Sequence, residues 1–150
     1  MKPNHLHRWR VMAALCVVPL LTTSCYSAGS NNWKAVANGV NGDAGPVEIR
    51  SLLIVSTEAG KPGRLLGTLV NDSEEEVNVV ISDSDDTISV SLPAKGSYPF
   101  DTQPATLDTV ADIPGSLVSV SVEAGTAQAD LEVPVMDGSL KEYRPYLPGN

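Results

Sequence analysis

The side chain with the clearest chemistry in this sequence is the thiol of Cys25. It ends the stretch "LLTTSC", in which two threonines and Ser24 follow the apolar run at residues 11–21. A cysteine directly behind such a run and a small residue matches a bacterial lipobox. The chemistry is alkylation of the thiol by a diacylglycerol, followed by cleavage of the chain after Ser24. The spacing therefore predicts Cys25 as the lipidation site and Ser24 as the last residue removed.

The residues ahead of Cys25 have the layout of an export signal. The apolar run at 11–21 has eleven residues, whereas a helix needs about twenty to cross a bilayer. Lys2, Arg8 and Arg10 precede it without any acidic residue, which is the basic start of a secretory signal. We expect residues 1–24 to be a lipoprotein signal peptide. The alternative is a plain secreted protein in which Cys25 keeps a free thiol.

The chain that remains after cleavage has few side chains suited to catalysis or metal binding. Both histidines and Cys16 lie within residues 1–24, so the mature chain has no histidine and a single methionine, Met136. A Ser-His-Asp triad needs a histidine. Copper and zinc need sulfur or imidazole ligands that are missing here. We expect no catalytic residue, no metal site and no cofactor, and we interpret Met136 as a packing residue at the end of a strand.

Two acidic turns could offer oxygen ligands to calcium. They read "NDSEEE" at residues 71–76 and "SDSDDT" at residues 82–87. Neither has the spaced Asp positions, the central Gly and the distal Glu of an EF-hand loop. Our interpretation is that both are solvated turns whose charges keep strand edges from pairing with other chains. A calcium site is the alternative.

The mature chain is strongly acidic. The signal contains three of the ten basic residues and none of the eighteen acidic ones, which leaves seven basic and eighteen acidic residues and a net charge of −11. Such a charge repels nucleic-acid phosphates and anionic lipid headgroups. We therefore expect no nucleic-acid binding, and we expect attachment to the membrane through the diacylglyceryl group on Cys25.

Short apolar or alternating runs separated by turn residues predict strands from residue 47 onward. The expected strands are 47–56, 64–71, 77–82, 87–92, 117–124 and 127–135, with a weak strand at 97–101 or near Leu107. Gly125-Thr126 should join the last two strands in a hairpin, because glycine at the first central position permits the positive φ of a type II′ turn. About seven short strands predict an all-β fold, a single antiparallel β-sandwich of immunoglobulin-like build.

The domain boundaries follow from these patterns. Behind the signal peptide, residues 25–45 are rich in Ser, Asn, Gly and Ala, which predicts a flexible tether carrying the lipidated cysteine. Residues 46–140 should form the sandwich, and residues 141–150 a C-terminal tail.

Several stretches resemble a known family. They are "GVNGDAGPVEIRSLLIVS", "LLGTLVND", "IPGSLVSVSVEAG" and "VPVMDGSLKEY", which resemble the small actinobacterial lipoproteins of the LpqE type. That family is distantly similar to the PCuAC-type periplasmic copper chaperones, and the resemblance implies a cupredoxin-like or immunoglobulin-like sandwich. The copper function does not carry over, because those chaperones bind Cu(I) through paired histidines and methionines.

Two functions remain open for such a chain. The first is a membrane-anchored, extracytoplasmic and non-enzymatic module that docks on an envelope protein or complex. Its candidate partner contacts are Tyr143, Arg144 and Tyr146, residue types that are enriched in interface cores. The second is a lipoprotein that binds a small ligand or a cation. A structural role also stays open for the tail, which could fold back over one edge of the sandwich.

The anchor prediction can be tested by removing the acceptor thiol. The substitution Cys25→Ala should abolish incorporation of labelled fatty acid and release the protein from membranes, while the domain still folds. Fatty-acid labelling of the variant would contradict the lipobox interpretation, as would a wild-type protein that is fully soluble and begins at another residue.

Overall fold

The computed structural model describes residues 39–149. Residues 1–38 and residue 150 lie outside the described part, and with them Ser24, Cys25, the predicted signal peptide and most of the predicted tether. No helix within residues 39–149 is long and apolar enough to cross a membrane.

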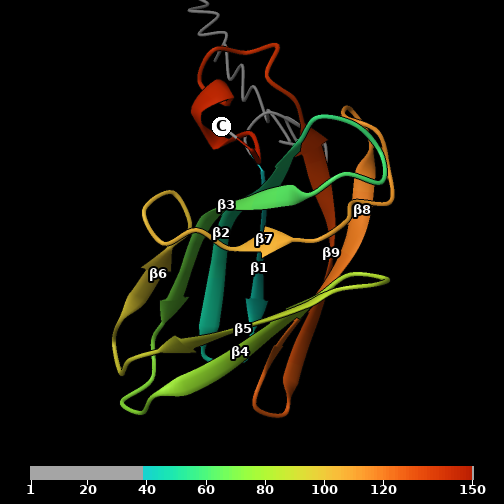
Figure 1. Ribbon diagram of the computed structural model, residues 1–150. Coiled ribbons are helices and arrows are strands. Elements are labelled where there is room, and N and C mark those ends of the chain that lie inside the picture. Colours follow the sequence, from blue (N-terminus) through green and yellow to red (C-terminus); the bar gives the residue numbers. More distant parts are fainter. Residues whose placement is uncertain (1–38, 150) are drawn as a thin grey trace, which may run out of the picture. The chain divides into compact units, whose positions relative to one another are not determined.

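Strands make up almost all of the regular structure of the described part, as Figure 1 shows. They are β1 (Val40–Ala44), β2 (Val47–Ser56), β3 (Gly63–Asn71), β4 (Val77–Ser82), β5 (Thr87–Leu92), β6 (Ser97–Pro99), β7 (Thr106–Leu107), β8 (Leu117–Ala124) and β9 (Ala127–Met136). A 3₁₀ turn, η2 (Arg144–Tyr146), lies in the tail. The predicted all-β sandwich is confirmed, with nine strands in place of about seven. Both alternatives for the weak strand form, as β6 and β7.

The first strand was missed from the sequence. β1 (Val40–Ala44) lies within the range 25–45 that was expected to form a tether. Its sequence "VNGDA" is dominated by residues that are depleted in strands, so no apolar pattern marks it. Pairing with β2 stabilises it instead, with Ala44 opposite Val47 and Val40 opposite Leu52.

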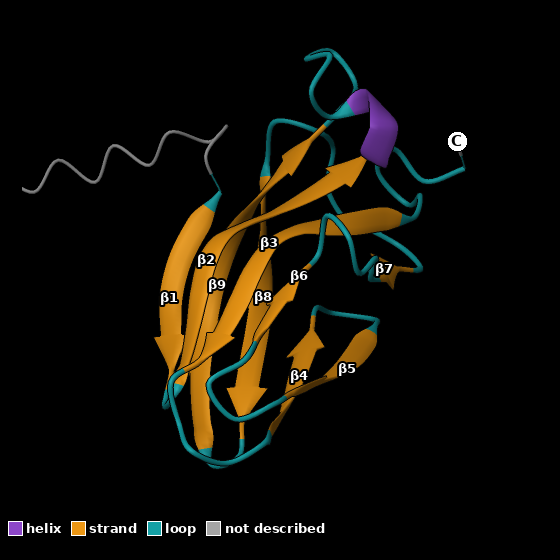
Figure 2. Ribbon diagram, turned by 90° about the vertical axis from the view of Figure 1, so that its left-hand side faces the viewer, coloured by secondary structure: helices purple, strands orange, loops and turns teal. Residues whose placement is uncertain are grey.

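The strands form two sheets that share β9. β5, β4, β8 and β9 pair in one sheet, and β1, β2, β3, β6 and β7 pair in the other. The last residues of β9, Val135 and Met136, pair in parallel with Ile54 and Val55 of β2. The hydrogen-bonded order is therefore β5-β4-β8-β9-β2-β3-β6, a mixed sheet nearly closed into a barrel-like sandwich (Figure 2). The predicted antiparallel pairing holds for every other pair of described strands.

The sequence of β9 fits its place in both sheets. Exposed Asp130 and Glu132 alternate with the partly buried Ala129 and Leu131 in its first part, whereas residues 133–135 are all buried. Alternation suits a strand with one solvated face, and continuous burial suits a strand covered on both faces. β9 therefore begins as a strand with one solvent-exposed face and ends as a strand that is covered on both faces.

A bulge in β2 changes which side chains face the core. Val47 and Ile49 belong to the main core before the bulge, and Leu52 and Ile54 belong to it afterwards, so the inward alternation moves by one residue. Ser51 adopts a φ of 53° at this point, and the register with β3 is interrupted there. One extra residue in a strand has this effect, because side chains alternate with a period of two.

Two glycines make room for this bulge. A Cβ on Gly67 in β3 would lie 2.7 Å from the carbonyl oxygen of Arg50, and a Cβ on Gly39 would collide with the carbonyl of Ser51. Both glycines also have positive φ angles, +118° and +73°, which other residues rarely adopt. The bulge therefore depends on glycine at both positions.

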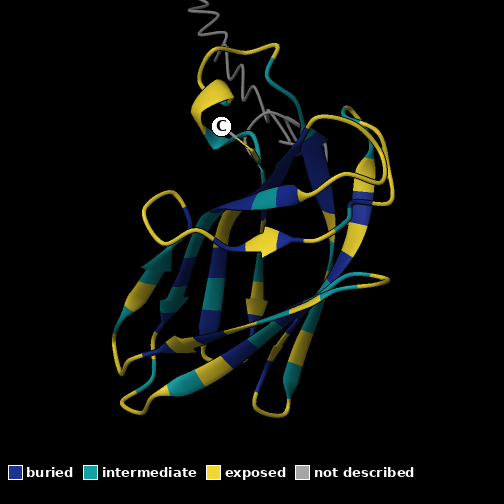
Figure 3. Cartoon of the chain, in the orientation of Figure 1, coloured by how far each residue is buried: buried dark blue, intermediate teal, exposed yellow. Residues whose placement is uncertain are grey.

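The main core fills the space between the two sheets. Its largest fully buried side chains include Phe100, Ile49, Leu52, Ile54, Leu65, Leu69, Ile81, Leu92 and Leu107. Figure 3 shows alternating buried and exposed colours along β8, where Val118, Val120 and Val122 face this core. The hairpin after β8 matches its prediction. Ala124 pairs with Ala127, and Gly125 has a φ of 64° while Thr126 does not have a positive φ.

A second, smaller apolar cluster lies on the outer face of β2 and β3. The bulge turns Leu53 and Val55 to this face, and Leu66 of β3 joins them. The side chains packed over the cluster are Met136, Tyr143, Tyr146 and Leu147. The tail therefore folds back over the sheet at the end of the sandwich where β2 and β9 finish, which we call the tail end (Figures 1 and 2).

The contribution of the tail to stability can be measured directly. Because Tyr143 and Tyr146 cover the outer cluster, the double substitution Tyr143→Ala and Tyr146→Ala should lower the thermal midpoint by several degrees, about 1 kcal/mol being worth roughly 4–8 °C in a small domain. Leu140→Ala is the control, because that side chain is 48% exposed and should leave the midpoint nearly unchanged. Equal midpoints for the double variant and the wild type would show that the tail packing contributes nothing.

Candidate functional site

The three candidate contacts in the tail occupy two different environments. Tyr143 and Tyr146 are half-buried against the outer cluster, and the guanidinium carbon of Arg64 lies 5.0 Å from the ring centroid of Tyr146. Arg144 is exposed, and its Nε donates to the carbonyl oxygen of Gly138 at 2.9 Å. The two tyrosines thus have a packing role in the structure, while contact with a partner stays a prediction for all three.

The first acidic turn is organised by a buried asparagine. Asn71 donates its amide to the carbonyl oxygens of Glu75 at 2.7 Å and Pro93 at 3.0 Å. Its Oδ1 accepts from the backbone N–H and the hydroxyl of Ser73, at 2.9 and 2.7 Å. Lys95 adds an ion pair with Glu74 at 3.2 Å. These contacts connect the turns at residues 72–76 and 93–96. Glu74 is the one acidic side chain that takes part in them.

The second acidic turn uses its carboxylates to bind backbone. Oδ1 of Asp83 accepts from the N–H groups of Asp85 and Asp86, at 3.0 and 2.8 Å. Oδ2 of Asp86 accepts from the N–H of Thr109 at 2.9 Å. Side-chain oxygens engaged in this way define a tight turn. No group of three His, Cys, Asp or Glu side chains within residues 39–149 is placed to hold a metal ion.

Three large apolar side chains of the described residues are strongly exposed. They are Ile113 at 61%, Leu117 at 46% and Leu140 at 48% exposure. Ile113 precedes the turn at Pro114 and Gly115, Leu117 begins β8, and Leu140 lies in the loop after β9. We call these three residues the apolar rim. Ile113 and Leu117 flank a turn that is hydrogen-bonded to Val135 of β9, and exposed aliphatic side chains are candidates for an interaction surface.

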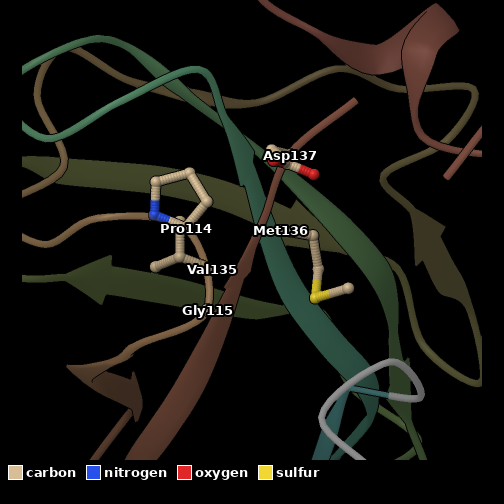
Figure 4. A pocket seen from close by; sticks show the side chains of 5 residues that line it. All are labelled: Pro114, Gly115, Val135, Met136 and Asp137. Atoms are coloured by element: carbon tan, nitrogen blue, oxygen red, sulfur yellow. The ribbon is translucent and has the colours of Figure 1, made fainter. Parts of the chain in front are cut away.

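A shallow pocket separates the two segments that form this rim. It has a volume of about 220 Å³ and is lined by Pro114, Gly115, Val135, Met136 and Asp137. Figure 4 shows the side chains of Pro114 and Val135 on one side of β9 and that of Met136 on the other, where Met136 packs against the outer cluster. This placement of Met136 agrees with its interpretation as a packing residue.

Backbone hydrogen bonds fix the two walls of the pocket. The N–H of Gly115 donates to the carbonyl oxygen of Val135 at 2.8 Å, and the N–H of Val135 donates to the carbonyl oxygen of Ser116 at 3.0 Å. The turn before β8 is therefore bound to the part of β9 that enters the second sheet.

Asp137 places a negative charge on the pocket wall. Its Oδ1 accepts from the backbone N–H of Ser139 at 2.8 Å, and its Oδ2 accepts from the Ser139 hydroxyl at 2.9 Å. These hydrogen bonds hold the pKa of the Asp137 carboxyl below its ordinary value, so the group is ionised at neutral pH. Asp137 forms no ion pair with any of the described residues.

A second hollow lies over β4, β8 and β9. It has a volume of about 400 Å³ and is lined by Ser82, Asp83, Ser84, Ser119, Val120, Ser121 and Asp130. The hydroxyl oxygen of Ser121 is buried and has no hydrogen-bond partner in the described part of the chain. Small-molecule sites are mostly apolar with a few polar groups. The residue types that line this hollow are mostly serine and aspartate.

The apolar rim and the pocket were not predicted from the sequence. The signal was the stretch "DIPGSL" at residues 112–117, in which isoleucine and leucine flank a Pro-Gly turn. Such turns are usually polar, so two large aliphatic residues around one indicate exposed apolar surface. The contribution of β9 could not be found in this way, because it depends on which strands meet in space.

Comparisons with known proteins add no family to this picture. A scan against models of protein families gives no match, and a search of curated proteins gives none either.

Proposed function

We propose that this protein is a lipid-anchored, extracytoplasmic interaction module without enzymatic activity, which docks on a protein of the cell envelope. The observation that supports the docking role is the apolar rim, three strongly exposed aliphatic side chains, two of which flank the turn that is hydrogen-bonded to Val135. The order of the chain supports the anchor, with an apolar run, Ser24 and Cys25 ahead of the domain.

The anchor in this proposal is the lipid on Cys25. Two or three acyl chains hold a protein on a membrane persistently, since each buried methylene contributes about 0.8 kcal/mol. The net charge of −11 in the mature chain favours anchoring by lipid over attraction to anionic headgroups. The proposed location is the extracytoplasmic face of the cell membrane, and membership of the LpqE-type lipoproteins is part of the same proposal.

Docking through the apolar rim is favoured over docking through the tail tyrosines. Tyr143 and Tyr146 already pack on the outer cluster, so presenting them to a partner would uncover Leu53 and Val55. Ile113 and Leu117 are exposed without any such cost. Covering aliphatic surface of this kind removes it from water and contributes roughly 25 cal/mol per Å² before the costs of association.

The alternative of a ligand-binding lipoprotein has less support. The pocket at the tail end, at about 220 Å³, is smaller than the roughly 300–1,000 Å³ typical of small-molecule sites. The hollow over β4, β8 and β9 is large enough at about 400 Å³, but Val120 is its one apolar lining residue. A cation-binding role would need further ligands beside Asp83 and Asp130.

The docking role can be tested with the double substitution Ile113→Ser and Leu117→Ser. If the apolar rim is the contact, recovery of the partner with the protein from its own solubilised membranes should fall at least about tenfold, the scale for losing two interface side chains. The thermal midpoint should hardly change, because both side chains are exposed.

Val80→Ser is the matched control, since Val80 is a half-buried aliphatic residue on β4 away from the tail end. Unchanged recovery with the Ile113/Leu117 variant would contradict the proposed contact. Loss of recovery with the Val80 variant instead would move the contact to β4, away from the tail end.

A further inference from the structure

One of the two sheets has no basic residue. Its strands β5, β4, β8 and β9, with the turns inside the β4-β5 and β8-β9 hairpins, cover residues 77–92 and 117–136 (Figure 2). These ranges contain no lysine and no arginine. None of their carboxylates forms an ion pair with a described residue. The sheet is therefore negatively charged without counter-charges of its own. Its acidic residues are Asp83, Asp85, Asp86, Glu123, Asp130 and Glu132.

The hollow of about 400 Å³ lies on the outer face of this sheet. The valines of β8 face the core, so Ser119 and Ser121 between them face outward. The register places Ser82 of β4 and Asp130 of β9 opposite Ser121, one on each side. Residues directly opposite in antiparallel strands have their side chains on the same face, with Cβ atoms roughly 4.5–5.5 Å apart. Two hydroxyls and a carboxylate therefore stand in one row across the hollow.

Several polar groups of the hollow are available to a partner. Oδ1 of Asp130 accepts from Nε2 of Gln128 at 2.8 Å, and Oδ1 of Asp83 accepts two backbone N–H groups of its own turn. The Oδ2 atoms of both aspartates accept no hydrogen bond from a described residue. The buried hydroxyl of Ser121 has no partner in the same part of the chain. Such a hydroxyl costs free energy, which an N–H donor from a partner would offset.

This acidic surface is continuous with the apolar rim. Leu117, Ser119 and Ser121 follow one another on the outer face of β8, with about 6.5–7 Å between successive residues on that face. The Ser119 hydroxyl donates to Oε1 of Glu132 at 2.6 Å, which places a second carboxylate between Leu117 and the row of Asp130. Exposed aliphatic and acidic groups therefore meet along one strand.

We propose that the hollow receives a lysine- or arginine-containing segment of the docking partner, with its cationic groups at Asp83 and Asp130 and its neighbouring apolar residues on Leu117. This inference rests on the proposed docking function and names the chemistry of the partner. Opposite charges on two surfaces accelerate their encounter and fix their orientation. The covered aliphatic surface adds affinity.

Other occupants fit this surface less well. Its carboxylates repel anionic lipid headgroups and nucleic-acid phosphates. Within residues 39–149, no three His, Cys, Asp or Glu side chains are placed to hold a metal ion. The negative charge also extends over β8, β9 and the turn after β4, beyond the hollow itself. A chain with several positive charges matches this extent better than a single small cation does.

The test is a titration with a defined basic peptide. The ¹⁵N-labelled protein, purified from its own cells in a neutral detergent, is titrated at low salt with acetyl-tetralysine amide while its amide signals are followed. The matched probe is the same peptide with every lysine carbamoylated, which replaces the ammonium by a neutral urea. Tetralysine should shift the signals of Ser82, Ser119, Ser121 and Asp130, and its affinity should fall as salt is added. Equal shifts from both peptides would overturn the proposal.

The double substitution Asp130→Asn and Glu132→Gln assigns the effect to this face. It should weaken tetralysine binding at least about threefold, the scale for losing two exposed charge contacts. Glu75→Gln with Glu76→Gln is the matched control, because it removes the same charge from exposed positions in the turn before β4 and should hardly change the affinity. Equal weakening by both double variants would show only a general attraction to an acidic domain, and would overturn the proposal.

A longer peptide tests the continuity with the apolar rim. Adding two leucines to one end of tetralysine should strengthen binding about three- to tenfold for one of the two ends. The gain should be lost in the variant Ile113→Ser and Leu117→Ser. No gain from either end, in a protein whose partner recovery depends on the apolar rim, would overturn the assignment of both contacts to one partner.

The failure of this inference is distinguishable from that of the docking role. If tetralysine binds at the hollow while neither partner recovery nor the gain from the leucines depends on Ile113 and Leu117, the basic site stands and the docking role of the rim fails. If partner recovery depends on the rim while the hollow does not respond to tetralysine, the docking role stands and the present inference is wrong.

Discussion

The parallel pairing of β9 with β2 is the interaction on which the rest of the domain depends. Without it, the β5-β4-β8-β9 sheet and the sheet around β2 and β3 would be two antiparallel sheets held by side-chain packing alone. Val135 and Met136 bring β9 beside Ile54 and Val55, which joins both sheets into one nearly closed structure. Closure removes unpaired strand edges at this side and buries backbone groups that would otherwise need water.

The consequences of this crossing reach the surface of the tail end. The last residues of β2 are buried on both faces of the sheet. Their side chains on the outer face, Leu53 and Val55, are covered by three residues of the tail, Tyr143, Tyr146 and Leu147. The turn before β8 is bound to Val135 by backbone hydrogen bonds, so it presents Ile113 and Leu117 beside the end of β9. The pocket and the apolar rim are thus products of the same constraint that closes the sandwich.

Local sequence predicted the strands well but not their assembly. The range 47–56 was predicted as a strand and forms β2 with these bounds, because its apolar residues and the turn residues beside it are local signals. The bulge at Ser51 was not predicted, since it depends on Gly67 and Gly39 in neighbouring segments. The same holds for the site. Tyr143 and Tyr146 were chosen by residue type and pack on the outer cluster, whereas the lining of one pocket by Pro114 and Asp137 depends on which strands meet in space.

Amide hydrogen exchange along β9 tests the central claim most directly. If the crossing holds the two sheets together, the amide of Met136, which pairs with Val55 of β2, exchanges only when the whole domain unfolds, as slowly as the amides of Val120 and Val122 in the middle of β8. Rapid exchange at Met136, with Val120 and Val122 still protected, would show that the end of β9 separates from β2 independently and would contradict this role of the crossing.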